Sequence, residues 1–378
     1  MNTMDSKNIT SECESFLASF FNKKKCILTG NGTVSLAICY SFMPHNKTKV
    51  IIPSVVCPNL VYALTYASKK PVYADVLLSN ATIDPDCVRT ILDNDKDNEI
   101  GAIVAVHLYG HQAQIHKLRS IADEYNVLLI EDICQSMGGR SRDGQLLGVV
   151  GDCTVMSFGH TKIIDVNEGG GVLVNSNKLE NKARKFISLL PDQLSLNKRE
   201  CLSRVYRELF YSIWNGGSCN DHFYQIFDQF PSLFKGIYLT LFNDNLAKKI
   251  LSEFKELEKN INHRQAIYNI YKKMLSDIDQ IILFDSASSE APWRFSFRVN
   301  ARHRNILVEK IRKSGFNASI WYPCIASWTS NDKTLFKSGR LIEASVINLW
   351  VDAKCSLSSA KDSAKLIRKY FDDNRRLK

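Results

Sequence analysis

Residues 26–175 alternate short, uninterrupted apolar runs with helical stretches, and this alternation limits the possible folds more than any other feature of the sequence. Runs that are apolar throughout, rather than at every second position, are typical of strands buried on both faces. Helices between such strands favour parallel pairing, because a parallel connection must return to the same end of the sheet. The sequence therefore predicts an α/β fold with a mostly parallel sheet between helices. The predicted strands are residues 50–54, 71–76, 100–109, 126–132, 153–158 and 170–175.

The second half of the chain has a different organisation. Residues 190–235 are rich in aromatic side chains and lack clear strands, whereas residues 243–275 carry the clearest helical signal of the sequence. Strand and helix signals then alternate as in a small α+β domain with antiparallel strands. We predict a large domain over residues 1–245 and a small α+β domain over residues 246–378, entered by a long helix. The predicted strands of the small domain are residues 280–285, 293–300 and 345–350.

Composition excludes several classes of protein. Of the 378 residues, 45% are hydrophobic, which is too many for a disordered chain. The formal net charge of +10 is compatible with nucleic acid or with an anionic small molecule as a ligand. Basic residues form only short clusters, at 23–25 and 375–378, so we expect no nucleic-acid partner.

The eleven cysteines are odd in number and include no C-x-x-C pair, which favours free thiols in a reducing compartment. The first residues lack the basic and apolar pattern of a signal peptide, and no apolar run reaches 18 residues. We therefore expect a cytoplasmic protein without a membrane partner.

The segment TGNGTVSL, residues 29–36, predicts a strand followed by a tight turn and a helix. The free N–H groups at the start of a helix suit a phosphate. Gly32 allows the backbone to approach a ligand, and the Thr33 hydroxyl adds a donor. Thr33 as a simple helix cap is an alternative interpretation. The segment matches neither the P-loop nor the dinucleotide-binding pattern.

Two further segments carry chemically useful side chains. The predicted strand 126–132 ends in Glu131 and Asp132, and Gln135 follows. Ligands of parallel sheets bind at the carboxyl ends of strands, although either acid is also suited to capping the next helix. After the predicted strand 153–158, the turn Gly159-His160-Thr161 leads to Lys162. A lysine at such a turn suits imine chemistry, although most lysines are simply exposed.

Together, a phosphate-binding turn, a carboxylate at a strand end and a lysine 30 residues after that carboxylate are the groups that pyridoxal 5′-phosphate requires. The lysine binds the cofactor covalently, the carboxylate keeps the pyridine nitrogen protonated, and the turn holds the phosphate. No metal ion is expected in such a site.

With these segments in place, the sequence resembles the DegT/DnrJ/StrS group of pyridoxal-phosphate-dependent sugar aminotransferases. The resemblance rests on GNGTVSL, VIIPSVVC, LLIEDICQS, SFGHTK and NEGGGVLVN, and it continues more weakly to residues 321–325 and 345–352. It implies fold type I, the aspartate aminotransferase fold. In that fold, a mostly parallel seven-stranded sheet lies between helices in the large domain, and a smaller α+β domain follows.

The resemblance also implies roles for individual residues. Lys162 matches the catalytic lysine, Asp132 the partner of the pyridine nitrogen, and Gln135 a residue that contacts the pyridoxal ring oxygen. Cys57 stands where many members place an aromatic ring against the cofactor, which is a departure from the pattern. The phosphate-binding positions are matched by Gly32, Thr33 and Ser157.

A second departure concerns residues 236–245, GIYLTLFNDN. Family members carry at this point an asparagine that reaches the phosphate of the neighbouring subunit. Asn243 or Asn245 is a candidate for that role, but neither aligns well. Residues 190–235 are also longer than the family pattern, so we interpret them as an atypical, aromatic-rich helical insertion.

From the resemblance we expect transfer of the amino group of glutamate to a keto group of a nucleotide-linked deoxysugar, in the biosynthesis of surface polysaccharides or secondary metabolites. The expected partners are the amino donor, the keto-sugar nucleotide and a second copy of the chain in a homodimer. Two alternatives remain open: a sugar dehydratase on the same scaffold, since His160 lies near Lys162, and a degenerate member that binds a partner without catalysis.

Overall fold

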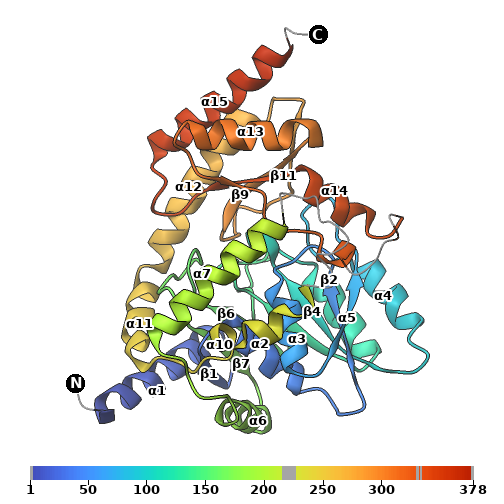
Figure 1. Cartoon of the computed structure of the whole chain (residues 1–378), viewed down its shortest axis with the longest axis vertical. Coiled ribbons are helices and arrows are strands. Elements are labelled where there is room, and N and C mark those ends of the chain that lie inside the picture. Colours follow the sequence, from blue (N-terminus) through green and yellow to red (C-terminus); the bar gives the residue numbers. More distant parts are fainter. Residues whose placement is uncertain (1–2, 215–226, 329–331, 333, 376–378) are drawn as a thin grey trace.

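Two β-sheets and the helices around them make up the computed structural model, which describes residues 3–214, 227–328, 332 and 334–375 (Figure 1). The larger sheet has seven strands, in the order β1-β7-β6-β5-β4-β2-β3. Neighbouring strands from β6 to β3 are parallel, whereas β7 is antiparallel to both β1 and β6. The predicted α/β fold with a mostly parallel seven-stranded sheet is therefore confirmed. The strands are β1 Lys25–Thr29, β2 Lys49–Pro53, β3 Lys70–Ala74, β4 Ile100–Val106, β5 Leu128–Asp132, β6 Cys153–Ser157 and β7 Gly170–Val174.

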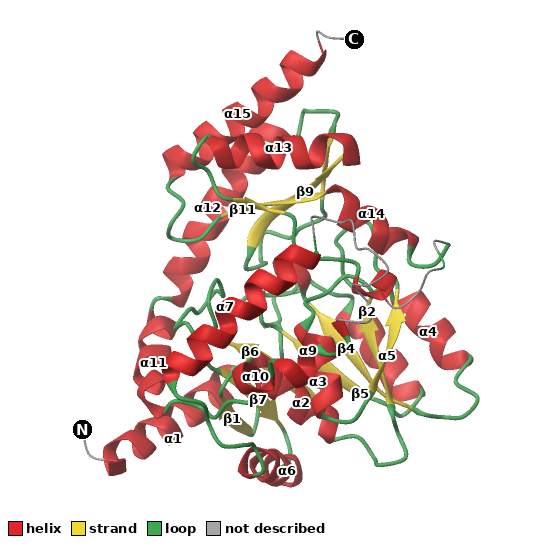
Figure 2. Cartoon of the chain, viewed as in Figure 1, coloured by secondary structure: helices red, strands yellow, loops and turns green. Residues whose placement is uncertain are grey.

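Helices cover both faces of this sheet, which explains why its strands are apolar throughout. Ile52 and Val104 belong to the core that includes α2 and α3, whereas Ile51 and Ile103 belong to the core that includes α4 and α5. Figure 2 shows the yellow strands between the red helices. The helices of this part are α1 Thr3–Phe20, α2 Gly32–Ser41, α3 Asn59–Tyr66, α4 Pro85–Asp93, α5 Ile115–Glu124 and α6 Asn177–Ser188.

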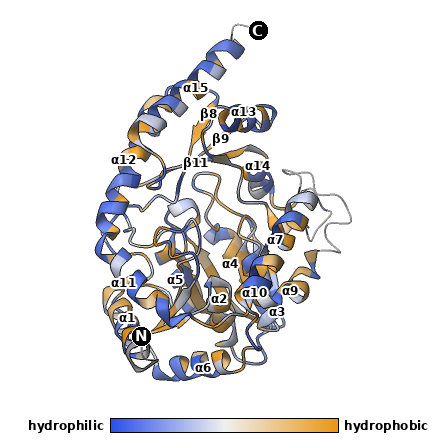
Figure 3. Ribbon diagram, turned by 60° about the vertical axis from the view of Figure 1, so that its left-hand side comes forward, coloured by the Kyte–Doolittle hydropathy of each residue, from blue (hydrophilic) through white to orange (hydrophobic). Residues whose placement is uncertain are grey.

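The second sheet is antiparallel, as predicted, with the order β10-β11-β9-β8. Its apolar side packs against α12, α13 and α15. Figure 3 shows that α13 is mainly hydrophilic on its visible side. The elements of this part are β8 Ile281–Leu283, β9 Arg294–Val299, α13 Ala301–Lys313, β10 Ala318–Ser319, α14 Lys337–Ser345, β11 Val346–Trp350 and α15 Leu357–Arg375.

The prediction of one long helix over residues 243–275 is wrong in detail. The structure has two helices, α11 Ala247–Lys255 and α12 Leu257–Leu275, separated at Glu256. Glu256 has ψ of 3°, outside the range of an α-helix. The apolar spacing of three between residues 254 and 257 is equally compatible with a continuous helix, so the pattern did not show the break.

Three described helices lie between residues 190 and 240, namely α7 Leu196–Ile213, α9 Phe230–Leu233 and α10 Lys235–Tyr238, whereas residues 190–195 are not helical. Residues 215–226 of the predicted insertion lie outside the described residues. The inner side of α7 carries Tyr206 and Phe210. The Tyr206 ring packs edge-on against Phe234, and the Phe210 ring stacks on Trp321 of the C-terminal part at 5.6 Å.

The ten cysteines that the structure describes are free thiols, six of them buried, as the sequence predicted; Cys219 lies outside that part of the chain. Among the described helices, none combines the length and apolarity needed to cross a membrane.

Asp75, directly after β3, holds the start of α14 through backbone N–H groups. Its carboxylate accepts hydrogen bonds from Ser338 N at 3.0 Å and Gly339 N at 2.9 Å, and one from Ser54 Oγ. We expect Asp75→Ala to lower the free energy of unfolding by about 2–3 kcal/mol, because two N–H groups lose a charged acceptor. Urea unfolding measures this change. Asp97→Ala, at an exposed loop position, is the control and should stay within about 0.5 kcal/mol of the wild type; equal losses in both variants would contradict the role of Asp75.

Candidate active site

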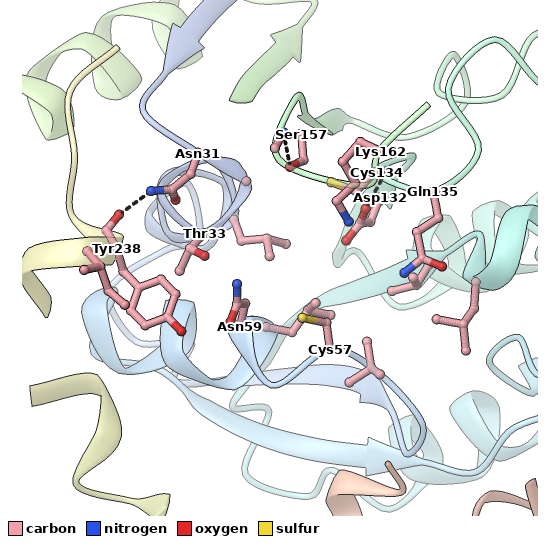
Figure 4. Close-up of a pocket in the computed structure, with 18 residues that line it drawn as sticks. Asn31, Thr33, Cys57, Asn59, Asp132, Cys134, Gln135, Ser157, Lys162 and Tyr238 are labelled. Carbon is pink, nitrogen blue, oxygen red and sulfur yellow. Dashed lines mark hydrogen bonds between the residues drawn. The ribbon is translucent and has the colours of Figure 1, made fainter. Parts of the chain in front are cut away.

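A cavity of about 260 Å³ opens at the carboxyl ends of β4, β5 and β6 (Figure 4). This is the edge of a parallel sheet where ligands bind. The cavity brings together residues that lie far apart in the sequence. Its lining includes all seven predicted site residues: Gly32, Thr33, Cys57, Asp132, Gln135, Ser157 and Lys162.

One end of the cavity is formed by the start of α2. Asn31 caps this helix, because its side chain accepts a hydrogen bond from Val34 N at 3.0 Å, so Thr33 is not the cap. The Thr33 side chain lines the cavity instead. A Cβ added at Gly32 would lie 3.1 Å from Ser157 Cβ, so glycine is needed for the close approach of the two segments. The start of this helix and the two hydroxyls of Thr33 and Ser157 make this end suitable for an anion.

Asp132 ends β5 and is 4% exposed. Its Oδ1 accepts a hydrogen bond from Cys134 N at 2.9 Å, which fixes the carboxylate beside the cavity. Among the described residues that line the cavity, Asp132 is the sole acid and Lys162 the sole cation. The cavity therefore pairs one fixed negative group with one amine.

Glu131 does not line the cavity and has a structural role. Its carboxylate accepts hydrogen bonds from the backbone N–H groups of residues 148, 150 and 151, at 2.6–3.0 Å. His107 Nε2 lies 3.1 Å away, and His107 Nδ1 accepts from Ala113 N, which places the imidazole proton on Nε2. Burial opposes ionisation of Glu131, but these donors outweigh burial and lower its pKa.

Lys162 reaches the cavity from the loop after β6, and the C-terminal part of the chain holds this loop. Trp293 Nε1 donates to Thr161 O at 2.8 Å, and Thr161 N donates to Asp165 Oδ2 at 2.8 Å. His160 does not line the cavity. Its side chain is 65% exposed and lies 3.5 Å from Asp165. The structure therefore places the lysine, and not the neighbouring histidine, in the site.

Gln135 connects the cavity to the C-terminal part of the chain. Its Oε1 accepts from Tyr109 N at 2.8 Å, and its Nε2 donates to the Tyr322 hydroxyl at 2.9 Å. Tyr109 in turn donates through its hydroxyl to Trp321 O. These bonds fix the amide plane of Gln135, so its remaining N–H has a defined direction.

Two thiols, Cys57 and Cys134, line the cavity. Burial raises the pKa of Cys57, and the charge of Lys162 offsets part of this effect. Burial also raises the pKa of Cys134 well above its usual value, and Asp132 adds to the shift. Both groups are therefore neutral thiols, and Cys134 was not predicted as a site residue.

The segment 236–245 contributes residues that the sequence did not indicate. Asn243 lies outside the cavity, where its Nδ2 donates to Glu168 Oε1 at 3.3 Å, and Asn245 does not line the cavity either. Ile237 and Tyr238 from α10 line it instead, as does Asn59, the first residue of α3. Neither periodicity nor a motif marks these positions, because they meet the cavity only through tertiary contacts.

A second cavity of about 390 Å³ adjoins the first and shares three lining residues with it: Asn31, Gly159 and Ile237. Helix α7 contributes Arg199, Arg207 and the acid Glu200 to its wall, and Glu168 lies on the wall as well. Arg199 lies 3.3 Å from Glu168, so part of its charge is balanced within the chain.

Several curated proteins similar to this chain are named for a nucleotide-linked sugar or for an inosose. A GDP-perosamine synthase of Vibrio cholerae is 29% identical over 174 residues, which are 46% of each chain. A dTDP-3-amino-3,4,6-trideoxy-alpha-D-glucose transaminase of Micromonospora megalomicea is 30% identical over 176 residues, again 46% of each chain. An L-glutamine:2-deoxy-scyllo-inosose aminotransferase of Micromonospora echinospora is 30% identical over 167 residues, 44% of this chain and 39% of that protein. The matches therefore span about half the length of these relatives.

Solved structures resemble the fold over nearly the whole chain. PseC of Helicobacter pylori, an aminotransferase involved in the biosynthesis of pseudoaminic acid, has a TM-score of 0.75 at 18% identity, with 97% of this chain and 91% of that chain covered. An aminotransferase from Psychrobacter cryohalolentis has a TM-score of 0.73 at 15% identity, with 99% and 98% covered.

The family model of the DegT/DnrJ/EryC1/StrS aminotransferases matches residues 2–206 and 220–354. These ranges include most of the chain and every residue that lines the 260 Å³ cavity. The resemblance that the sequence motifs indicated is thus confirmed over both halves of the chain, and the chain belongs to the DegT/DnrJ/EryC1/StrS aminotransferase family.

Proposed function

We propose that this chain is a pyridoxal-phosphate-dependent aminotransferase that transfers the amino group of glutamate to a keto group of a nucleotide-linked deoxysugar. The observation that carries the proposal is the single cavity that holds Lys162, Asp132 and the anion-binding end at Gly32 and Thr33. Each of these groups has a separate function in the proposed reaction. Lys162 and Asp132 are the sole charged side chains among the described residues that line the cavity.

The cavity fits the cofactor on which enzymes of this family depend, pyridoxal 5′-phosphate. Its anion-binding end suits the phosphate because Gly32 leaves room that a Cβ would fill, and because Thr33 and Ser157 offer hydroxyl donors. Asp132 suits a protonated pyridine nitrogen, and Lys162 is the amine that an imine requires. The donor set therefore matches the phosphate, the ring and the aldehyde.

In the proposed reaction, bound pyridoxal phosphate supplies an electron sink next to the substrate amine. As general base, Lys162 would remove the proton from the substrate carbon that carries the amino group, and as general acid it would deliver that proton to the cofactor carbon that takes over the amino group. Asp132 stabilises the positive charge at the ring nitrogen through its fixed carboxylate. Gln135 orients the ring, since both atoms of its own amide are fixed by hydrogen bonds. Buried Leu36, Val56 and Leu60 in the lining limit access of water.

The acceptor is proposed from the names of the relatives and from the adjoining cavity. The names of two reported relatives contain a nucleotide-linked sugar, and the name of the third contains 2-deoxy-scyllo-inosose, a cyclitol ketone without a nucleotide. Arg199 and Arg207 in the adjoining cavity suit the diphosphate of a sugar nucleotide, whereas a free cyclitol has no such group. This favours a nucleotide-linked sugar as the substrate.

A spectrophotometric experiment tests the activity. The purified protein loaded with pyridoxal phosphate is mixed with glutamate, with glutamine in a parallel sample. We expect glutamate to convert the cofactor to its amine form with stoichiometric release of 2-oxoglutarate. Keto-sugar nucleotides and a cyclitol ketone are then screened for return of the original spectrum. A protein that binds the cofactor but converts with neither donor would favour the dehydratase or the degenerate member instead.

We also propose a cytoplasmic homodimer, supported by the resemblance of the sequence to fold type I enzymes. Light scattering after size-exclusion chromatography tests the oligomeric state. A monomer at all accessible concentrations, with full activity, would contradict this part of the proposal.

Arg207→Ala is expected to raise the KM for an anionic acceptor about tenfold with little change in kcat, because a charged hydrogen bond to the diphosphate is lost. Steady-state kinetics with a varied sugar nucleotide measure the change. Arg204→Ala is the matched control, since Arg204 is exposed on the same helix but does not line the adjoining cavity. An equal effect of both substitutions would point to general electrostatics and would contradict a diphosphate site.

A further inference from the structure

The proposed site must hold a phosphate without a free cation on its wall. Lys162 is the sole cation among the described residues that line the cavity, and in the proposed reaction its amine bonds to the cofactor aldehyde. The charge of the phosphate must therefore be met by neutral hydrogen-bond donors. The start of α2 and the hydroxyls of Thr33 and Ser157 supply some of them. Each additional donor near this end should have a measurable effect on affinity.

The segment that contains Tyr238 is held directly against the anion-binding end. Asn31 Nδ2 donates to Tyr238 O at 2.8 Å and to Thr240 Oγ1 at 2.9 Å. A Cβ added at Gly30 would lie 2.1 Å from Thr240 O, so the two backbones touch at this glycine. Asn31 is also the cap of α2. The same side chain therefore fixes both the helix that faces the anion and the segment that carries Tyr238.

Tyr238 is the sole aromatic side chain among the described residues that line the cavity. It is 7% exposed, and its ring packs against Tyr62 at 5.4 Å and Tyr206 at 5.8 Å. Figure 4 shows its ring directed into the cavity, with the hydroxyl toward Asn59. Burial raises the pKa of Tyr238 well above its usual value, and the neighbouring phenols add to the shift. The hydroxyl therefore stays protonated at neutral pH. Its single O–H is directed to Tyr206 and has to turn toward the cavity to donate to a ligand there.

Asn59 forms the neighbouring part of the wall. It is the first residue of α3, the second helix whose start faces the cavity. Its amide points into the same space as the Tyr238 hydroxyl (Figure 4). An amide is neutral at all relevant pH values and offers two N–H donors.

We propose that Tyr238 and Asn59 are further cofactor-binding residues, and that they donate hydrogen bonds to the phosphate of pyridoxal phosphate from the side opposite α2. The proposal rests on the proposed function, since it needs the cofactor in this cavity. It assigns to α10 and α3 of the same chain a contact that the sequence placed on Asn243 or Asn245.

The test compares ligands with and without the phosphate. Quenching of tryptophan fluorescence gives the Kd of pyridoxal phosphate and of pyridoxal for the full-length apoprotein. We expect Tyr238→Phe and Asn59→Ala each to raise the Kd of pyridoxal phosphate about tenfold, as for a lost hydrogen bond to a charged group, and to leave the Kd of pyridoxal unchanged. Tyr62→Phe is the matched control. The Tyr62 hydroxyl is buried beside Tyr206 and does not line the cavity, so neither Kd should change.

The outcomes separate this inference from the proposed function. A wild-type protein that binds no pyridoxal phosphate would overturn both. Wild-type binding with an unchanged Kd in both Tyr238→Phe and Asn59→Ala would overturn only the inference. A Kd raised equally for both ligands would also overturn it, because the lost contact would then be to the ring. Thermal melting of each apoprotein variant shows whether its fold is retained, and Tyr238→Phe keeps the ring that packs against Tyr62.

Discussion

Lys162→Ala should remove both covalent cofactor binding and turnover, which is the largest effect expected for a single substitution in this chain. The variant loses the group that bonds to the aldehyde and the base that moves the proton. General acid–base catalysis alone contributes about 10²–10⁴-fold, so turnover should fall by at least about 10³-fold. Because Lys162 lies in a cavity and the C-terminal part of the chain holds its loop through Thr161, the fold should be retained.

Covalent binding is measured by reduction of the cofactor–protein complex with borohydride, followed by peptide mass spectrometry. In the wild type the added mass should lie on the peptide that contains Lys162, and in the variant it should be absent. Lys178→Ala, on the exposed side of α6, is the control and should behave like the wild type. An added mass on another lysine, with activity retained in Lys162→Ala, would refute the assignment of the site.

Most of the sheet was predictable because burial on both faces leaves a strong local signal. Six of the seven strands in the larger sheet begin within two residues of the predicted first residue. The carboxyl ends of β5 and β6 carry the predicted site residues Asp132 and Ser157. The start of α2 was equally visible, because a glycine-bearing turn between a strand and a helix is a local pattern. The site residues that these local patterns indicated, Gly32, Thr33, Asp132 and Ser157, all line one cavity.

The remaining wall of the cavity was not predictable, because it depends on contacts between distant segments. Tyr238 is 207 residues from Asn31, whose side chain fixes it, and Tyr322 is 187 residues from Gln135. The break at Glu256 was missed for a related reason, since the apolar spacing there fits both one helix and two. Local patterns thus indicate which groups face a site, whereas packing decides which further groups close it.

The adjacent acids Glu131 and Asp132 offer the second large effect, because successive residues of a strand point to opposite sides. Asp132→Asn keeps an acceptor for Cys134 N but removes the negative charge beside the proposed ring nitrogen. We expect turnover to fall about 10²–10³-fold, as for the loss of one preorganised electrostatic contact, while the free energy of unfolding changes little. Kinetics of the loaded enzyme and urea unfolding measure the two quantities on the same preparation.

Glu131→Gln should give the reverse result. The substitution removes the charge that four donors stabilise, so the free energy of unfolding should fall by about 3 kcal/mol, with kcat per folded molecule within about threefold of the wild type. The sign of the pH dependence follows from the lowered pKa of Glu131. The ionised Glu131 carboxylate contributes its full stabilisation of the folded state above pH 4.5, the ordinary carboxyl pKa. This contribution is lost as the pH falls through the lower pKa of the folded state. Glu131→Gln should therefore unfold with a weaker dependence on acid than the wild type. If Asp132→Asn lost stability and Glu131→Gln lost turnover, the two carboxylates would have the opposite roles, and the assignment of Asp132 to the cofactor would be wrong.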